Sequence, residues 1–317
     1  MRPTVTVLDD YQRVALASAD WSAVQAAFDV QVLTEHIDDA DELVARLETS
    51  EVVVAMRERT PFRASTLARL PRLRLLVTTG MANASIDLDA ARAQGVTVAG
   101  TGGSGSSMPE ITIGMMIALA RGFVPEDRAV RTGGWQHTIG PGLAGHTLGL
   151  VGLGRLGALI VPLARAFAMG VIAWSPHLTP ARAAEVGGVR AVGKRELFAT
   201  ADYVSVHMAL APATRDLVGA AEFALMKPTA YLVNTSRGPI VTESALLDAL
   251  RSGRIAGAAL DVYDSEPLPA DHPLRTTPNT LLLPHIGYVT TDAYRIFYRD
   301  AVEDILAWHA GTPVRLL

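Results

Sequence analysis

Strand-like and helix-like segments alternate along the whole chain of 317 residues, and this pattern limits the fold more than any other feature. Short apolar runs such as TVTVLDD (4–10) and EVVVAM (51–56) are separated by amphipathic stretches such as DADELVARLE (39–48). Such alternation favours parallel strands joined by right-handed helical crossovers. We therefore predict an α/β protein with parallel sheets, and the chain is long enough for two domains.

The amino-acid composition changes near residue 100, and this change indicates the boundary between the first domain and the second. The segment AGTGGSGSSMPE (99–110) is a glycine- and serine-rich connector, and six further strands follow it before a closing amphipathic helix. We predict a nucleotide-binding domain at residues 101–287. It is inserted into a domain formed by residues 1–100 and 288–317, although a simple tandem order also fits the alternation.

Composition and charge exclude several classes of protein. The net charge is −4 and the isoelectric point is near 6.1, so the chain lacks the basic excess of nucleic-acid-binding proteins. It has no cysteine, which excludes disulfides and thiolate metal sites, and we predict no metal site. The longest strongly apolar run, at 111–120, is too short to cross a bilayer, and the N-terminus lacks the features of a signal peptide. We expect a cytoplasmic protein without membrane or nucleic-acid partners.

A glycine-rich motif between a strand and a helix predicts a dinucleotide site. The segment LGLVGLGRLG (148–157) places Gly152, Gly154 and Gly157 as GxGxxG, and another strand follows at 171–174. The first glycine permits a tight turn, the second lets the backbone approach a pyrophosphate, and the third allows close packing of helix and strand. The N–H groups at the start of the helix then face the anion.

The position that selects between NAD and NADP carries Ser175, where an acidic residue would bind the ribose hydroxyls. Without a carboxylate there is no repulsion against a 2′-phosphate, and His177 and Arg182 are near in sequence. No arginine follows Ser175 directly, and the serine could simply cap a turn before Pro176. The choice between NAD and NADP stays open at this stage.

Three later strands of the same domain each end next to a polar group suited to oxo-acid chemistry. Arg237 follows LVNTS, Glu266 lies in ALDVYDSEP, and His285 follows LLLP. An arginine binds a carboxylate through two hydrogen bonds, a histidine exchanges a proton near neutral pH, and a glutamate orients the histidine ring. Each residue alone has an ordinary structural explanation, such as a solvated loop charge. Their shared placement at strand ends favours a catalytic role.

These motifs together resemble the D-isomer-specific 2-hydroxyacid dehydrogenase family, which includes 3-phosphoglycerate dehydrogenase and glyoxylate/hydroxypyruvate reductases. The resemblance extends over nearly the full length. It implies a Rossmann-type doubly wound nucleotide domain inserted into a flavodoxin-like substrate-binding domain, with the active site in the cleft between the domains and a homodimer formed through the nucleotide domain. The segments that carry the resemblance, in order, are TTGMANASIDLDAA, MPEITIGMMIALAR, GLVGLGRLG, ADYVSVHMAL, LVNTSRGPIV, ALDVYDSEP and PHIG.

The resemblance also implies roles for individual residues. It assigns Arg237, Glu266 and the acid–base His285 to catalysis on a small 2-oxo or D-2-hydroxy acid, with NAD or NADP as cofactor. Substrate contacts would come from Arg57 and from the backbone N–H groups of Met81 and Ala82. Arg57 could equally be a solvated charge at a strand end. The implied cofactor contacts are Arg155, Leu156, Thr235, Ser236 and Asp261.

The sequence departs from the commoner family pattern in three places near the implied substrate. The turn reads MANAS, HMAL replaces H-x-P-L, and Tyr288 follows the histidine motif where a small residue is commoner. These departures lie around the implied substrate or nicotinamide, so the resemblance does not name a particular substrate. Separately, a phosphite dehydrogenase-like oxidoreductase on the same scaffold is an alternative, and so is a non-enzymatic NAD(H)-sensing protein on the same fold. Formate chemistry needs no proton donor to a carbonyl, so a His285–Glu266 pair is evidence against it.

Overall fold

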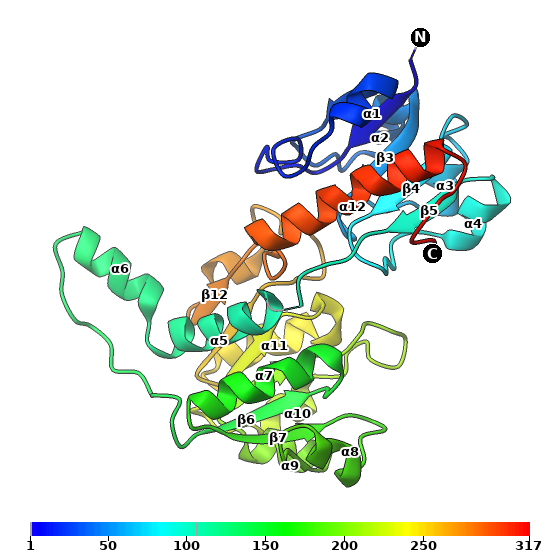
Figure 1. Cartoon of the computed structure of the whole chain (residues 1–317). Helices are drawn as coiled ribbons and strands as arrows, with labels where there is room; N and C mark the ends of the chain where they lie inside the picture. Colours follow the sequence, from blue (N-terminus) through cyan, green and yellow to red (C-terminus); the bar gives the residue numbers. More distant parts are fainter. Residues whose placement is uncertain (1, 106) are drawn as a thin grey trace. The chain divides into compact units, whose positions relative to one another are not determined.

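The computed structural model describes residues 2–105 and 107–317. The chain forms two compact units. One contains the segment up to Ser104 together with Val289–Leu317, and the other is Gly105–Tyr288. The blue and red ends of the chain in Figure 1 therefore belong to the same unit, and the second unit is inserted into the first. Which unit binds the substrate and which the cofactor stays a prediction at this point.

The first unit is built on a five-stranded, fully parallel sheet in the order β2-β1-β3-β4-β5, which is the flavodoxin-like order. Leucines of α2, α3 and the strands pack on one face of this sheet, and α12 contacts β4 and β5 as well as α1. The strands are β1 (Thr4–Val7), β2 (Asp29–Val32), β3 (Ser50–Ala55), β4 (Leu75–Thr78) and β5 (Thr97–Gly100). The helices are α1 (Ser22–Ala27), α2 (Ala40–Leu47), α3 (Ala64–Leu67), α4 (Leu88–Ala93) and α12 (Thr291–His309).

The second unit is built on a seven-stranded parallel sheet in the order β12-β11-β10-β9-β6-β7-β8. Counted from β6, this is the Rossmann order with one added edge strand, and the order reverses between β6 and β9. The strands are β6 (Thr147–Val151), β7 (Gly170–Trp174), β8 (Arg190–Ala191), β9 (Tyr203–Val206), β10 (Tyr231–Asn234), β11 (Gly257–Leu260) and β12 (Thr280–Leu282). The helices are α5 (Ser107–Ala120), α6 (Phe123–Arg131), α7 (Arg155–Ala166), α8 (Pro180–Glu185), α9 (Lys194–Thr200), α10 (Ala220–Leu225) and α11 (Glu243–Arg251), with short 3₁₀ turns at Gly238–Ile240 and Pro273–Thr276.

Helices cover both faces of the second sheet, which explains why its strands read as continuous apolar runs. Neighbouring strand residues point to opposite faces: Leu232 packs in the cluster formed with α9, α10 and α11, whereas Val233 packs in the cluster formed with α5 and α7. Both sheets are parallel and doubly wound, so the predicted fold class is confirmed.

Three elements were absent from the sequence prediction. Strand β8 has only two residues, Arg190 and Ala191, one exposed and one half-buried. Strand β2 is an edge strand whose residues alternate between exposed and half-buried, so DVQV lacks the apolar run that marks the other strands. Helix α6 contains no buried residue, and in Figure 1 it stands away from the sheet of its own unit.

Within the described residues, no single helix is long and apolar enough to cross a membrane. The pair Ser107–Ala120 and Phe123–Arg131 would reach that length and composition only if taken together, and it is bent by 60°.

Candidate active site

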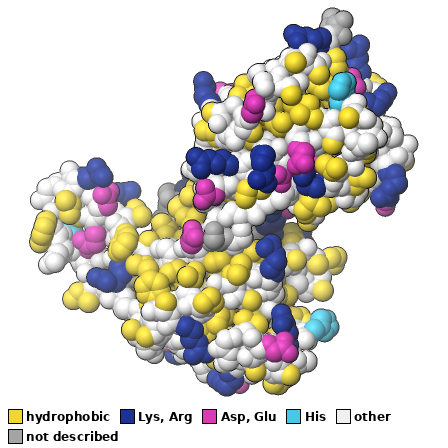
Figure 2. Space-filling model, in the orientation of Figure 1, with side chains coloured by type: hydrophobic (Ala, Val, Ile, Leu, Met, Phe, Trp, Pro, Cys, Tyr) yellow, Lys and Arg dark blue, Asp and Glu magenta, His cyan; other side chains and the backbone are white. Residues whose placement is uncertain are grey.

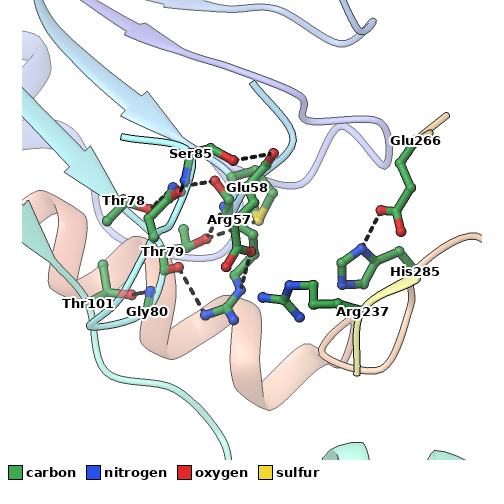
Figure 3. A network of polar contacts seen from close by, with 12 residues as sticks. Arg57, Glu58, Thr78, Thr79, Gly80, Ser85, Thr101, Arg237, Glu266 and His285 are labelled. Atoms are coloured by element: carbon green, nitrogen blue, oxygen red, sulfur yellow. Dashed lines mark hydrogen bonds and ion pairs between the residues drawn. The ribbon is translucent and has the colours of Figure 1, made fainter. Parts of the chain in front are cut away.

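His285 and Glu266 form a paired group at the carboxyl edge of the second sheet. The Nδ1 atom of His285 lies 2.5 Å from Oε2 of Glu266, and the two side chains are 17% and 28% exposed. The pair is drawn at the right of Figure 3. His285 has a left-handed backbone with φ of 54°, which is uncommon for a residue other than glycine. With Nδ1 engaged, Nε2 is the ring nitrogen available to another molecule.

Asp261 holds the backbone that directly follows His285. Its carboxylate is almost fully buried, and its two oxygens accept the N–H groups of Ile286 at 2.8 Å and Gly287 at 2.7 Å. Burial raises the pKa of Asp261, and these two N–H donors oppose that rise. A Cβ on Gly287 would lie 3.0 Å from Oδ2 of Asp261, so the turn after His285 fits closely on this carboxylate. The structure therefore shows Asp261 as a support for the His285 turn, and its predicted contact with the cofactor stays a prediction.

Arg237 lies in a turn fixed by a buried asparagine that the sequence reasoning missed. Asn234, the last residue of β10, accepts the N–H of Ser236 at 3.0 Å and donates to the carbonyl of Arg237 at 3.0 Å. The guanidinium of Arg237 donates to the carbonyl of Ser236 at 2.7 Å. The neighbouring Thr235 hydroxyl lies 3.1 Å from that of Thr112 on α5. Arg237, Glu266 and His285 thus follow the adjacent strands β10, β11 and β12 on one edge of one sheet.

The glycine turn after β6 has the shape that a dinucleotide requires. Gly152 has φ of +104°, and a Cβ there would lie 2.4 Å from the carbonyl oxygen of His207. A Cβ on Gly157 would lie 2.4 Å from the carbonyl oxygen of Gly152, whereas one on Gly154 would meet no atom within 4 Å. Gly154 is the N-cap of α7 and provides no side chain to satisfy its first N–H groups. Gly152 and Gly157 are therefore needed for close packing. Gly154 leaves open space at the N-terminus of α7, where a pyrophosphate fits.

The predicted contacts around this turn differ in exposure. Arg155 is exposed and Leu156 is half-buried in the first turn of α7, while Ser175 is half-buried directly after β7. The carbonyl of Ser175 accepts the N–H of Leu178 at 3.1 Å, so Ser175 also begins a turn. Arg182 pairs with Glu185 at 2.9 Å on the surface.

His207 supports the glycine turn and was not among the predicted site residues. It follows β9, where the strand order reverses, and its carbonyl packs against Gly152. Its Nε2 lies 2.7 Å from the hydroxyl of Ser205, and burial lowers the pKa of the ring to about 3. A neutral imidazole therefore lies beneath the turn near neutral pH. The HMAL segment that contains it was noted in the sequence only as a departure from a motif.

In the first unit, Arg57 is held at the carboxyl edge of the five-stranded sheet. Its N–H donates to the hydroxyl of Thr79 at 2.9 Å, its guanidinium donates to the carbonyl of Thr79 at 3.3 Å, and Asn83 donates to its carbonyl at 2.6 Å. Figure 3 shows the contact between the Arg57 guanidinium and Thr79. Arg57 has φ of 53°. Gly80 has φ of +92°, which favours glycine, and a Cβ there would lie 2.0 Å from Nη1 of Arg57 and would displace the guanidinium.

The turn after Gly80 presents backbone donors. Met81 is 49% exposed and Ala82 is also exposed. In the described part of the chain, the N–H groups of these two residues donate to no protein acceptor. Within this part of the chain, both N–H groups are therefore without a protein acceptor and lie in exposed residues, as a carboxylate-binding turn requires. Among residues 2–105 and 107–317, no cluster of three or more potential ligands could hold a metal ion.

The Rossmann order, the glycine turn and the paired histidine define a protein of the dinucleotide-binding α/β class. Comparison with known proteins narrows this class. Residues 113–287 match the family model described as D-isomer specific 2-hydroxyacid dehydrogenase, NAD binding domain. The chain is 34% identical to a glycerate dehydrogenase of Methylorubrum extorquens over 285 residues, which cover 86% of this chain and 87% of the relative. The chain therefore belongs to the D-isomer specific 2-hydroxyacid dehydrogenase family, as the sequence motifs predicted.

Two further relatives show how far the similarity extends. A D-3-phosphoglycerate dehydrogenase of Methanocaldococcus jannaschii is 36% identical over 269 residues, which cover 84% of this chain and 51% of the relative. The chain thus spans about half the length of the phosphoglycerate dehydrogenases that it matches. The crystal structure of a phosphoglycerate oxidoreductase from Vibrio cholerae O395 superimposes with a TM-score of 0.92 at 34% identity, covering 98% of this chain and 100% of the other. The match to an NAD-binding domain supports the predicted NAD or NADP cofactor.

Proposed function

We propose that this chain is an NAD(P)-dependent oxidoreductase that interconverts a small 2-oxo acid and the corresponding D-2-hydroxy acid. The observation that carries the proposal is the His285–Glu266 pair, with Nδ1 of the ring 2.5 Å from the carboxylate and Arg237 on the same sheet edge. Family membership supports the reaction class, since the relatives described above are named as dehydrogenases or oxidoreductases.

In this proposal His285 is the acid and base. Glu266 holds Nδ1 and compensates the charge of the imidazolium, so proton transfer to the substrate oxygen takes place at Nε2. When bound, NAD or NADP would supply or accept the hydride that the reaction at C2 of the substrate requires. Arg237 binds the substrate carboxylate through its guanidinium, and the Asn234 contacts keep the arginine turn in place.

We further assign substrate binding to three residues of the first unit. The N–H groups of Met81 and Ala82 suit a carboxylate, and Arg57 supplies a positive charge on the same sheet edge. The hydrogen bonds of Arg57 with Thr79 and Asn83 hold its backbone and guanidinium in place. In the second unit, Thr235 and Ser236 are proposed to contact the nicotinamide side of the cofactor, and Asp261 its carboxamide.

The test is oxidation of NADH and, separately, of NADPH, followed by absorbance in the presence of glyoxylate, hydroxypyruvate, pyruvate, phenylpyruvate or 2-oxoglutarate. We expect turnover with at least one acid. Cofactor binding without turnover on any acid would refute the proposed reaction. It would instead favour a phosphite dehydrogenase-like enzyme or a sensor, and a phosphite assay separates these two.

We propose that Ser175 allows both cofactors to bind. Ser175→Asp would place a negative charge where the 2′-phosphate of NADP lies, so the dissociation constant for NADPH should rise by about tenfold or more while that for NADH does not. Equal changes for the two cofactors would show that residue 175 does not contact this part of the ribose.

A homodimer formed through the second unit is also part of the proposal. Helix α6 and the segment after it present large apolar side chains to solvent, including Trp135 at 71% exposure and Ile139, which is fully exposed. Figure 2 shows apolar side chains on this projecting region. An exposed apolar surface of this kind is typical of an interface. Combined Trp135→Ser and Ile139→Ser should produce monomers in light scattering, whereas Val314→Ser, an exposed apolar position in the first unit, should not. A wild-type monomer would refute the proposed dimer.

Cytoplasmic location and the absence of nucleic-acid and membrane partners stay predictions from composition.

A further inference from the structure

Tyr263 contacts each of the loops that carry the three proposed catalytic residues. It lies just after β11, it is only 8% exposed, and its ring packs in the apolar cluster that includes Ile240, Leu246 and Leu274. It lies within the ALDVYDSEP segment, but it was not among the predicted site residues.

Toward Glu266, the backbone of Tyr263 fixes one oxygen of the carboxylate. The Tyr263 N–H donates to Oε1 of Glu266 at 2.8 Å, while Oε2 faces Nδ1 of His285. Each carboxylate oxygen therefore has its own partner, and the plane of the carboxylate cannot rotate without loss of one of them. The direction in which Glu266 faces the histidine is thus set partly by Tyr263.

Toward His285, the side chain of Tyr263 joins the ends of two strands. Its hydroxyl donates to the carbonyl of Leu283 at 2.9 Å and lies 3.3 Å from the carbonyl of Leu260. Leu283 is two residues before His285, and Leu260 is the last residue of β11. Burial raises the pKa of the Tyr263 hydroxyl, so it remains a donor at physiological pH.

Toward Arg237, the contact is between backbones. A Cβ on Gly238 would lie 2.0 Å from the carbonyl carbon of Tyr263 and 2.5 Å from the N atom of Asp264. The turn after Arg237 therefore lies directly on the Tyr263 backbone, and a displacement of one loop must displace the other.

We propose that Tyr263 is a positioning residue that sets the distance and direction of the Glu266–His285 pair. Its hydroxyl fixes the strand end before His285, and its N–H fixes the carboxylate that holds the ring. This inference rests on the proposed function for its effect on turnover, but the geometry of the pair can be measured without any substrate.

Tyr263→Phe removes the hydroxyl and keeps both the ring and the N–H. The matched control is Tyr203→Phe, because Tyr203 is also a buried tyrosine of the same sheet whose hydroxyl donates to a backbone carbonyl, that of Gly142 at 3.4 Å. Tyr203 is the first residue of the central strand β9, at the amino ends of the parallel strands, whereas His285 follows the carboxyl end of the edge strand β12. Both variants lose one buried hydroxyl, so a purely structural effect should be similar in the two.

The first readout is the NMR signal of the His285 Nδ1 proton in protein labelled with ¹⁵N-histidine and bound to NADH, assigned by its loss in His285→Gln. We expect the signal to shift in Tyr263→Phe and to stay unchanged in Tyr203→Phe. The second readout is steady-state kinetics. We expect kcat to fall about tenfold in Tyr263→Phe, a part of what a general acid contributes, with KM and NADH affinity within about twofold of wild type.

An unchanged signal and kcat in Tyr263→Phe would overturn the inference, and so would equal changes in both variants. If wild-type protein shows no oxo-acid turnover but the His285 signal still shifts only in Tyr263→Phe, the proposed function fails and the positioning role of Tyr263 is supported.

Discussion

A substitution of Gly154, at the start of α7, can test cofactor binding with little effect on folding. A Cβ on Gly154 would meet no atom within 4 Å, and its φ of −80° suits any residue. Gly154→Ala should therefore cost only about 0.5–1 kcal/mol of folding free energy, as expected for alanine at an N-cap. The same methyl group would occupy the space where a pyrophosphate approaches the backbone. We expect the dissociation constant for NADH to rise at least tenfold, which corresponds to about 1.4 kcal/mol.

Gly193→Ala is the matched control for this change. Gly193 is the N-cap of α9 in the same unit, it also provides no capping side chain, and a Cβ there would also meet no atom within 4 Å. The control should show the same small loss of stability, measured by urea unfolding, with NADH affinity unchanged in a fluorescence titration. Equal NADH affinity in the two variants would refute the assignment of the glycine turn as the pyrophosphate site.

Three further changes test other parts of the structure. Gly157→Ala should cost about 1–3 kcal/mol in urea unfolding, because its Cβ would lie 2.4 Å from the carbonyl oxygen of Gly152; an unchanged unfolding midpoint would contradict this packing. Asp261→Asn should cost about 1–3 kcal/mol and lower kcat, because the amide leaves one buried N–H of the His285 turn without an acceptor; kcat equal to that of wild type would argue against this support. Burial raises the pKa of Asp304 to about 7 in the folded state, whereas the ordinary pKa of 3.8 applies in the unfolded state. Between these two pH values the folded protein therefore keeps a proton on Asp304 that the unfolded chain has released. Wild type should therefore lose stability relative to Asp304→Asn as pH rises from about 4 to about 7, by at most about 4 kcal/mol, and parallel stability profiles of the two proteins would refute this.

Much of the fold was predictable because its strands are buried on both faces. Each of the ten predicted strands overlaps an observed one, since parallel strands covered by helices read as apolar runs. The three missed elements lack that signal. Strand β8 has only two residues and forms no apolar run. DVQV (29–32) alternates between exposed and half-buried positions at a sheet edge. Helix α6 buries none of its residues, so its sequence shows no apolar face that would predict a helix packed on the core.

The proposed catalytic residues could be chosen from the sequence because their side chains carry the pattern, and their roles remain predictions. Arg237, Glu266 and His285 are polar residues placed after apolar strands, and a sequence shows this directly. The supports were missed because they act through the backbone. Asn234 fixes the Arg237 turn by bonding main-chain groups, and Tyr263 holds Glu266 through its own N–H. Such contacts depend on the three-dimensional course of the loops, which residue types alone do not specify.

The central claim is that His285 transfers the proton. The most direct measurement is kcat of His285→Ala with the best oxo acid found for wild type, together with the dissociation constant for NADH. We predict that kcat falls by about 10²–10⁴, the usual contribution of a general acid, while NADH affinity changes by less than about twofold. A His285→Ala protein that retains wild-type kcat would contradict the account.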